Sequence, residues 1–249
     1  MTYNVLNGGC GREADVLAVL TGVAPDLVVL QEVRDAEFVD WLANALEMKR
    51  FFARGNTRYH LAILSRWPIV ASGSHHPFPP IQQTVLEATI ARPGGLRVDV
   101  FGVHPAPFPS LPLELWRRWE ISVVLGRVRR RPPSLCLIAG DFNAVAPGDN
   151  PQIDRMRVLD RVLILLQGRR IHRFAIGAML RAGMTDCFRE LHPDADGFTY
   201  GPPAPNGRLD YIFANEALKP HLQRCFVVRE PPEVDRASDH YPVVAEFAL

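Results

Sequence analysis

The chain has 249 residues, of which 47% are hydrophobic and 22% are charged, and its formal net charge is +1. This is an ordinary composition for a soluble globular protein of a size that can form a single domain. The near-neutral charge provides no overall field that would attract nucleic acid or a membrane, although it leaves room for a local basic patch. No apolar run is long enough to span a membrane, so we expect no transmembrane segment.

The cysteine pattern argues against a zinc site. Cys10, Cys136, Cys187 and Cys225 are widely scattered and lack the close spacing of zinc ligands. A reducing compartment fits such a pattern, and we expect a cytoplasmic location. The chain opens almost directly on a strand-like segment, so we also expect a trimmed N-terminus, which could hide a removed signal peptide.

Strand-like and helical segments alternate in the first half of the chain. Short apolar runs predict strands at residues 2–6, 27–30, 61–65, 85–91 and 96–103. Helical spacing predicts helices at 12–20 and 35–48, the second with Asp35 as its N-cap. Gly94-Gly95 predicts a hairpin turn between the last two of these strands.

The second half of the chain continues the alternation. A proline-rich loop at 105–112 precedes a predicted helix at 113–130. Further strands are predicted at 134–139, 209–214, 225–228 and 243–247. The stretch 151–182 has two helical patterns, and its segment 156–166 is unusually apolar for a surface helix. We expect that segment to pack on the core; capping a cleft or contacting a partner are the alternatives.

Alternating strands and helices predict an α/β fold. The adjacent strands between Leu61 and Val103 argue against a simple doubly wound sheet. Two packed sheets with helices outside fit better. No repeat or linker divides the chain, so we expect one domain over residues 1–249, with a helical insertion at about 151–182.

Polar side chains follow several of the apolar runs. Glu32 comes directly after one predicted strand, where it is either a metal ligand or a charged residue that ends the strand. Asp141 and Asn143 follow another, with Gly140 allowing a sharp turn and Phe142 between them directed into the core. An acid and an amide on one face can orient a water and hold a phosphoryl oxygen, and we favour this interpretation over a simple polar turn.

Two histidines also lie in suggestive places. Asp210 and His240 suggest a carboxylate–imidazole pair in which the acid would keep the ring cationic. Asp239 could add a metal ligand, although Ser238-Asp239-His240 alone would more simply be a polar turn. His104 ends the predicted strand 96–103 and is a candidate second phosphate contact across the cleft, although a lone histidine at a strand end is usually structural.

The polar clusters form an ordered set that spans the chain. They are Asn4, Gln31-Glu32, His104, Gly140-Asp141-Phe142-Asn143, Arg208-Leu209-Asp210-Tyr211 and Ser238-Asp239-His240. This set resembles the endonuclease/exonuclease/phosphatase superfamily, which includes DNase I, exonuclease III, neutral sphingomyelinases and inositol polyphosphate 5-phosphatases. Each motif is weak alone, but their order is specific. The resemblance implies a DNase I-like four-layer sandwich, with two facing, mainly antiparallel sheets flanked by helices.

The resemblance also implies a divalent metal, usually Mg²⁺ with Mn²⁺ as an alternative. Asn4 and Glu32 would hold it, with Asp239 nearby. Asp141 would orient or deprotonate the attacking water, and Asn143 would hold a phosphate oxygen. Asp210 would orient His240 toward the scissile phosphate. Where this chain has His104, the exonuclease III branch typically carries tyrosine and the DNase I and sphingomyelinase branches carry histidine.

The function expected from these residues is metal-dependent phosphodiester hydrolysis by in-line water attack, with nucleic acid as the first candidate substrate. A phospholipid or an inositol phosphate at the same site is the alternative. A binding protein without catalysis is a remote third. Sequence alone leaves endo- versus exonuclease action and oligomeric state open.

Overall fold

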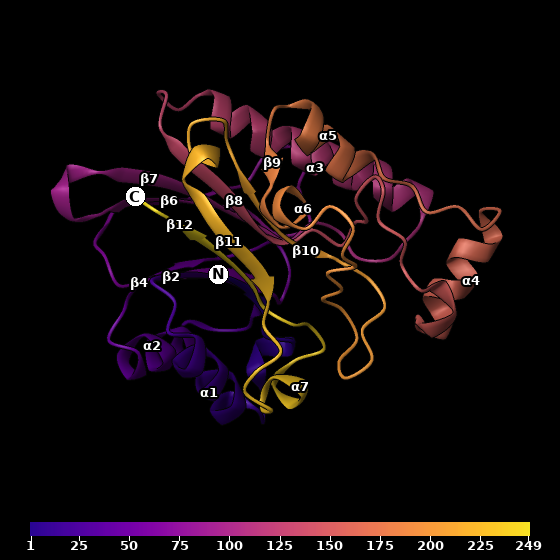
Figure 1. Cartoon of the computed structure of the whole chain (residues 1–249), viewed down its shortest axis with the longest axis horizontal. Helices are drawn as coiled ribbons and strands as arrows, with labels where there is room; N and C mark the ends of the chain where they lie inside the picture. The colour runs from indigo at the N-terminus through magenta and orange to yellow at the C-terminus, as the bar shows by residue number, and fades with distance from the viewer.

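Two six-stranded β-sheets face each other in the computed structural model, which describes residues 1–249, and helices cover their outer surfaces (Figure 1). In spatial order the first sheet contains β11 (Leu222–Val227), β12 (Val243–Phe247), β1 (Thr2–Asn4), β2 (Leu27–Val33), β4 (His60–Ser65) and β3 (Lys49–Ala53). The second contains β5 (Ile69–His75), β6 (Val85–Ala91), β7 (Arg97–Val103), β8 (Leu135–Asp141), β10 (Asp210–Ala214) and β9 (Thr185–Asp186). Only the pairs β1–β2 and β7–β8 are parallel. The predicted four-layer sandwich of two mainly antiparallel sheets is therefore confirmed.

The helices divide between the two outer surfaces. The first sheet carries α1 (Glu13–Val23), α2 (Ala36–Ala45) and α7 (Val234–Ala237). The second carries α3 (Leu111–Arg129) and α5 (Phe174–Arg181), while α6 (Cys187–Leu191) lies beside β10 and β11. Short 3-10 turns occur at Asn7–Gly9, Pro93–Gly95, Ile153–Arg155 and Lys219–His221. As predicted, Asp35 caps α2, since its carboxylate accepts a 2.9 Å hydrogen bond from the N–H of Phe38.

Three apolar clusters explain why the strands are nearly continuous apolar runs. One fills the space between the sheets, and its members include Val29 and Ile63 from the first sheet and Val100 and Ile212 from the second. The other two lie between each sheet and its own helices. Central strands are therefore buried on both faces, which removes the usual alternation of apolar and polar residues.

The helix α4 (Val158–Leu166) extends away from the body of the sandwich (Figure 1). Only Ile164 on this helix is fully buried, and most of its aliphatic side chains are exposed. The prediction that residues 156–166 pack on the core is therefore wrong. An apolar run shows that a helix needs a partner, but it does not show whether the same chain supplies one.

No helix combines the length and the apolar composition that a membrane span requires.

Candidate active site

The central strands of both sheets bring polar residues to one rim. Asn4 is the last residue of β1 and Asp141 the last of β8, while Asp210 begins β10 and pairs directly with Asp141. The Asn4 Nδ2 atom donates a 3.0 Å hydrogen bond to Oδ2 of Asp141. This bond joins one sheet to the other, so the candidate site is built at the seam of the sandwich.

A bulge directs Glu32 toward this rim. Glu32 lies within β2, not beyond its end as predicted, and it has a left-handed φ of 60° where the register of β2 against β4 shifts. Such a bulge turns a side chain out of the regular alternation of a strand. Its Oε1 accepts a 3.2 Å hydrogen bond from Asn4 Nδ2, and its Oε2 accepts one of 2.9 Å from the N–H of Asn7.

The turn after β8 places Asp141 and Asn143. Phe142 is fully buried, as predicted, against Tyr211 and Phe213. Asn143 adopts a left-handed φ of 49°, and its N–H donates a 2.9 Å hydrogen bond to Oδ1 of Asp141. The expectation that strand alternation puts Asp141 and Asn143 on one face is therefore wrong, because β8 ends at Asp141 and Asn143 has already left the strand. Asp141 and Asn143 therefore form a polar turn, and the same turn brings the two candidate functional side chains together.

Gly140 serves packing at this turn and not a sharp bend. A β-carbon at position 140 would lie 2.0 Å from the carbonyl oxygen of Val103, on the neighbouring strand β7. Only glycine lets β7 and β8 approach this closely. The close approach also brings His104, the next residue after β7, beside Asp141.

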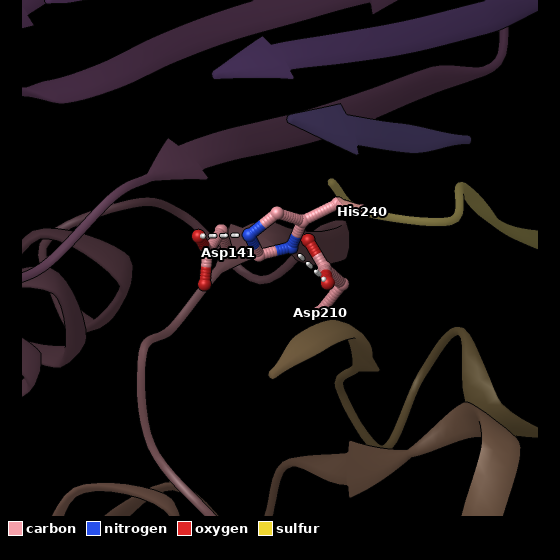
Figure 2. A group of neighbouring side chains, drawn as sticks. All are labelled: Asp141, Asp210 and His240. Carbon is pink, nitrogen blue, oxygen red and sulfur yellow. Dashed lines mark hydrogen bonds and ion pairs between the residues drawn. The ribbon is translucent and has the colours of Figure 1, made fainter. Parts of the chain in front are cut away.

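His240 lies between carboxylates (Figure 2). Its Nδ1 donates a 2.8 Å hydrogen bond to Oδ2 of Asp210, and its Nε2 lies 3.6 Å from Oδ2 of Asp141. Oδ1 of Asp239 lies 4.0 Å from the same Nε2. The loop that carries His240 is tied to the first sheet, because the Ser238 hydroxyl donates a 2.6 Å hydrogen bond to the carbonyl of Asn4.

The surrounding acids keep His240 protonated. Desolvation by burial lowers its pKa, but the charges of Asp210, Asp141 and Asp239 outweigh this effect and raise the pKa to about 10. Burial also raises the pKa of the Asp210 carboxyl. The pair is tightly coupled, and we assign its shared proton to the ring, because three carboxylates surround that ring. At neutral pH His240 is therefore a cationic donor whose Nε2 faces Asp141.

His104 approaches Asp141 from the other side. Its Nε2 lies 3.6 Å from Oδ2 of Asp141, the same distance as that of His240, while its buried Nδ1 has no hydrogen-bond partner. Glu120 of α3 positions the loop that follows His104, since its carboxylate accepts hydrogen bonds from the N–H of Ala106 at 2.9 Å and of Gln82 at 2.6 Å. Glu120 was not identified from the sequence, where it appears as one acid on an ordinary helix.

Glu120 should make stability depend on pH. Burial raises its pKa from 4.5 to about 7, although the two N–H groups and Arg117 lower it. Between pH 4.5 and about pH 7 the folded state keeps a proton on Glu120 that the unfolded state has lost. As the pH rises across this range, the free energy of unfolding should therefore fall by at most about 3 kcal/mol. Urea unfolding measured from pH 4.5 to about pH 8 should show this fall relative to Glu120→Gln, which cannot titrate. Parallel profiles for the two proteins would contradict it.

A cavity of about 230 Å³ lies against the candidate catalytic group. Glu32, His104 and Asn143 are among the residues that line it, and the proline-rich loop contributes Phe108. Its lining also includes Met156, Arg157, Asp160, Tyr200 and Leu209. The segment leading into α4 therefore forms part of the cleft wall, which is one alternative considered for residues 156–166.

Arg157 links that segment to the catalytic rim. Its Nη2 lies 2.6 Å from Oδ2 of Asp239, and its guanidinium lies over the ring of Tyr200 at 5.2 Å from the centroid. Neither contact could be inferred from the sequence, since Arg157 and Asp239 are far apart along the chain. Asp239 thus has one oxygen paired with Arg157, while its other oxygen, Oδ1, is buried without a hydrogen-bond partner.

A network of buried ion pairs supports the turn that carries Asp141 and Asn143. The Arg208 Nε lies 2.9 Å from Oδ2 of Asp149, and its Nη1 lies 2.7 Å from Oδ2 of Asp186. Arg189 adds a second cation to Asp149 at 2.7 Å. Arg208 is nearly inaccessible to solvent and lies two residues before Asp210. The network therefore fixes the start of β10 relative to the loop that follows Asn143.

The model of the "Endonuclease/Exonuclease/phosphatase family" matches residues 1–240. The chain belongs to this family. No curated protein sequence shows a significant match.

Solved structures share the fold over nearly their whole length. An AP endonuclease from Archaeoglobus fulgidus is 21% identical, with a TM-score of 0.78 and coverage of 100% of this chain and 98% of that one. The 3' phosphatase NExo from Neisseria, solved with a product DNA hairpin, is 25% identical with the same TM-score and the same coverage. Truncated TDP2 from Caenorhabditis elegans is 19% identical, with a TM-score of 0.68 and coverage of 99% and 95%.

The rim of this phosphoesterase fits a hard divalent cation. Glu32 presents two carboxylate oxygens, and buried oxygens of Asp239 and Asp210 lack hydrogen-bond partners. Oxygen donors of this kind suit Mg²⁺. In the structure Asn4 turns its amide nitrogen toward the carboxylates and uses its oxygen to accept a 3.0 Å hydrogen bond from the N–H of Leu6. The predicted ligands Glu32 and Asp239 therefore offer oxygens at this rim, whereas Asn4 presents its amide nitrogen there and the structure does not show it as a ligand.

A second group of potential ligands lies deeper. Asp141, Asp210 and His240 offer atoms that all lie within 4.8 Å of one another. A buried group of this kind is consistent with a metal site typical of this family. Glu32 and Asp239 offer further carboxylate oxygens at the same rim.

Proposed function

We propose that this family member is a metal-dependent phosphodiesterase that hydrolyses nucleic acid by in-line attack of a water molecule. The placement of Asp141 carries the proposal. Its Oδ2 lies 3.6 Å from Nε2 of both His104 and His240, and the second of these rings is protonated at neutral pH. A carboxylate beside a fixed cationic donor can accept a proton from water while the donor binds a phosphate oxygen.

The residues then divide the chemistry. Asp141 accepts a proton from a water whose oxygen attacks the phosphorus, and the bond from phosphorus to the leaving oxygen on the opposite side breaks. His240 donates a hydrogen bond from Nε2 to a non-bridging phosphate oxygen, while Asp210 holds its Nδ1 in place. Asn143 and His104 border the same cavity and supply further donors to the phosphate. Mg²⁺, or Mn²⁺, would when bound offset the charge on the phosphate and the leaving oxygen.

Nucleic acid is the proposed substrate because two of the matched structures are an AP endonuclease and a 3' phosphatase that holds a DNA hairpin. The test is nicking of supercoiled plasmid by the purified protein with Mg²⁺ and with EDTA. We expect nicking only in the presence of the metal. The proposal would be contradicted if the plasmid stayed intact under both conditions and if 3'-phosphorylated and single-stranded oligonucleotides were also left unchanged.

A phospholipid or small phosphate ester is the second candidate, with the same catalytic residues. The observation that favours it is the exposed aliphatic surface of α4 beside the cleft. Hydrolysis of phospholipid vesicles or inositol phosphates without hydrolysis of plasmid would favour this alternative over a nuclease.

Metal binding should stabilise the folded protein. The carboxylates at the rim repel one another without a cation, and a ligand that binds only the folded state stabilises it by about 2.7 kcal/mol at a concentration near 100 Kd. For a chain of this size we expect saturating Mg²⁺ to raise the melting temperature by roughly 5–10 °C. Thermal denaturation with and without Mg²⁺ measures the shift.

Two variants and a control test whether the rise in melting temperature comes from Mg²⁺ bound at the rim. Glu32→Gln and Asp239→Asn should lose most of the shift. Glu246→Gln, at an exposed acid paired with Arg224 away from the rim, should keep it. A melting curve that Mg²⁺ leaves unchanged in the native protein would contradict a preformed site.

A further inference from the structure

The helix α4 turns its apolar face outward. Its side chains Val158, Leu159, Val162, Leu165 and Leu166 are between 44% and 78% exposed. At 100° per residue these five positions form one continuous face. The opposite face, toward the protein, carries half-buried Asp160 and Gln167 together with buried Ile164. This is the reverse of a normal surface helix, which buries its apolar face.

Specific contacts hold the helix in this orientation. At its C-terminal end the Gln167 side chain accepts a 2.8 Å hydrogen bond from the N–H of Leu111 and donates one of 2.6 Å to the carbonyl of Pro109. At its N-terminal end Arg157 pairs with Asp239. The apolar face is therefore presented by a helix anchored at both ends, next to the catalytic cleft.

The charges around this face are mainly positive. Arg155, Arg161, Arg169 and Arg170 are exposed and make no ion pair. Asp154 is the one exposed acid between Gln152 and Arg173. The chain as a whole has a net charge of only +1, so the positive charge beside the aliphatic face is a local feature.

We propose that residues 154–170 bind the surface of an anionic phospholipid bilayer. The five aliphatic side chains enter the boundary between head groups and acyl chains, and the arginines contact lipid phosphates. A short helix with aliphatic side chains on one face and arginines beside them suits this interface. The interaction adds a location to the proposed hydrolase and does not depend on which phosphate ester it hydrolyses.

Charge and chemistry favour an anionic bilayer on this face over a second copy of the chain or nucleic acid. A second copy of the chain would bring its own arginines against these, and like charges oppose such an interface. Nucleic acid would bind the arginines but would leave the aliphatic side chains in water. An anionic bilayer satisfies both at once. Since Met156, Arg157 and Asp160 line the cleft, docking would set the cleft beside the lipid surface.

Co-sedimentation of the full chain with vesicles tests the proposal. One set of vesicles contains phosphatidylglycerol and phosphatidylcholine, and the other contains phosphatidylcholine alone. We expect binding to the anionic set, weakened by salt. The double variant Leu165→Asp/Leu166→Asp should bind at least about tenfold more weakly, because it removes two leucines that the proposal places in the bilayer and adds charge that anionic lipid repels. Both side chains are exposed, so the variant should keep its melting temperature and its rate of plasmid nicking.

Val70→Asp is the control for added negative charge elsewhere on the surface, since it places an aspartate at an exposed valine on the edge strand β5. It should bind vesicles like the native protein. Absence of binding to anionic vesicles, or equal binding by the native protein and the double variant, would overturn the proposal. So would a dimer in sedimentation velocity that dissociates in the double variant while neither protein binds vesicles.

Discussion

Asp141→Asn should lower the rate of metal-dependent hydrolysis by roughly 100- to 10,000-fold, the usual contribution of a positioned general base. Asparagine has nearly the same shape, and its oxygen can still accept a hydrogen bond from Asn4 or from the N–H of Asn143. What it loses is the ability to take a proton from water. The rate of plasmid nicking, or of whichever phosphodiester the protein cuts, measures the loss at fixed Mg²⁺.

A second buried aspartate provides the control. Asp99 on β7 accepts hydrogen bonds from the hydroxyls of Thr89 at 2.6 Å and Ser134 at 2.7 Å, away from the rim. Asp99→Asn tests whether a buried aspartate can lose its charge without loss of activity, and it should retain a rate near that of the native protein. A native rate for Asp141→Asn would show that Asp141 is not the base and would require a different assignment of the site.

Arg208→Met should produce the largest loss of stability, about 3–5 kcal/mol in the free energy of unfolding. Methionine fills much of the same space but leaves the buried carboxylates of Asp149 and Asp186 without their central cation. Arg189 still contacts Asp149, so the loss falls most heavily on Asp186. Urea denaturation at neutral pH measures the change.

Two further variants separate this effect from general damage to the core. Arg208→Met combined with Asp186→Asn should recover part of the stability, because the unpaired charge is then removed. Arg224→Met breaks an exposed pair with Glu246 and should cost less than about 1 kcal/mol. If Arg208→Met were as mild as Arg224→Met, the buried network would not be a main support of the turn.

The strands that sequence predicted best lie inside the sheets and not at their edges. Residues 85–91 and 243–247 coincide with β6 and β12, and the turn at Gly94-Gly95 joins β6 to β7 as expected. The strands β3 and β5 were not predicted. Each lies at the edge of its sheet and carries exposed polar residues, so it lacks the continuous apolar run that marks a strand buried on both faces.

The candidate site also has a part that the sequence predicts and a part that it does not. The polar residues at strand ends could be found from the sequence, because parallel and antiparallel neighbours bring such ends to a common rim. The partners of those residues could not. The approach of His104 to Asp141 depends on how β7 packs on β8, and the pair Arg157–Asp239 depends on the path of the segment before α4. The roles assigned to these residues stay predictions, which applies to Asn4, Glu32, His104, Asp141, Asn143, Asp210, Asp239 and His240 alike.

The hydrogen bond from Asn4 to Asp141 has a consequence for folding kinetics. Because it joins the two sheets, the catalytic group is complete only after the sheets have docked in register. A chain that has formed its helices and hairpins but not this docked arrangement would show much of the native far-ultraviolet circular dichroism and would hydrolyse nothing. After dilution from urea, the recovery of hydrolysis should therefore report the joining of the two halves of the molecule and lag behind the recovery of secondary structure.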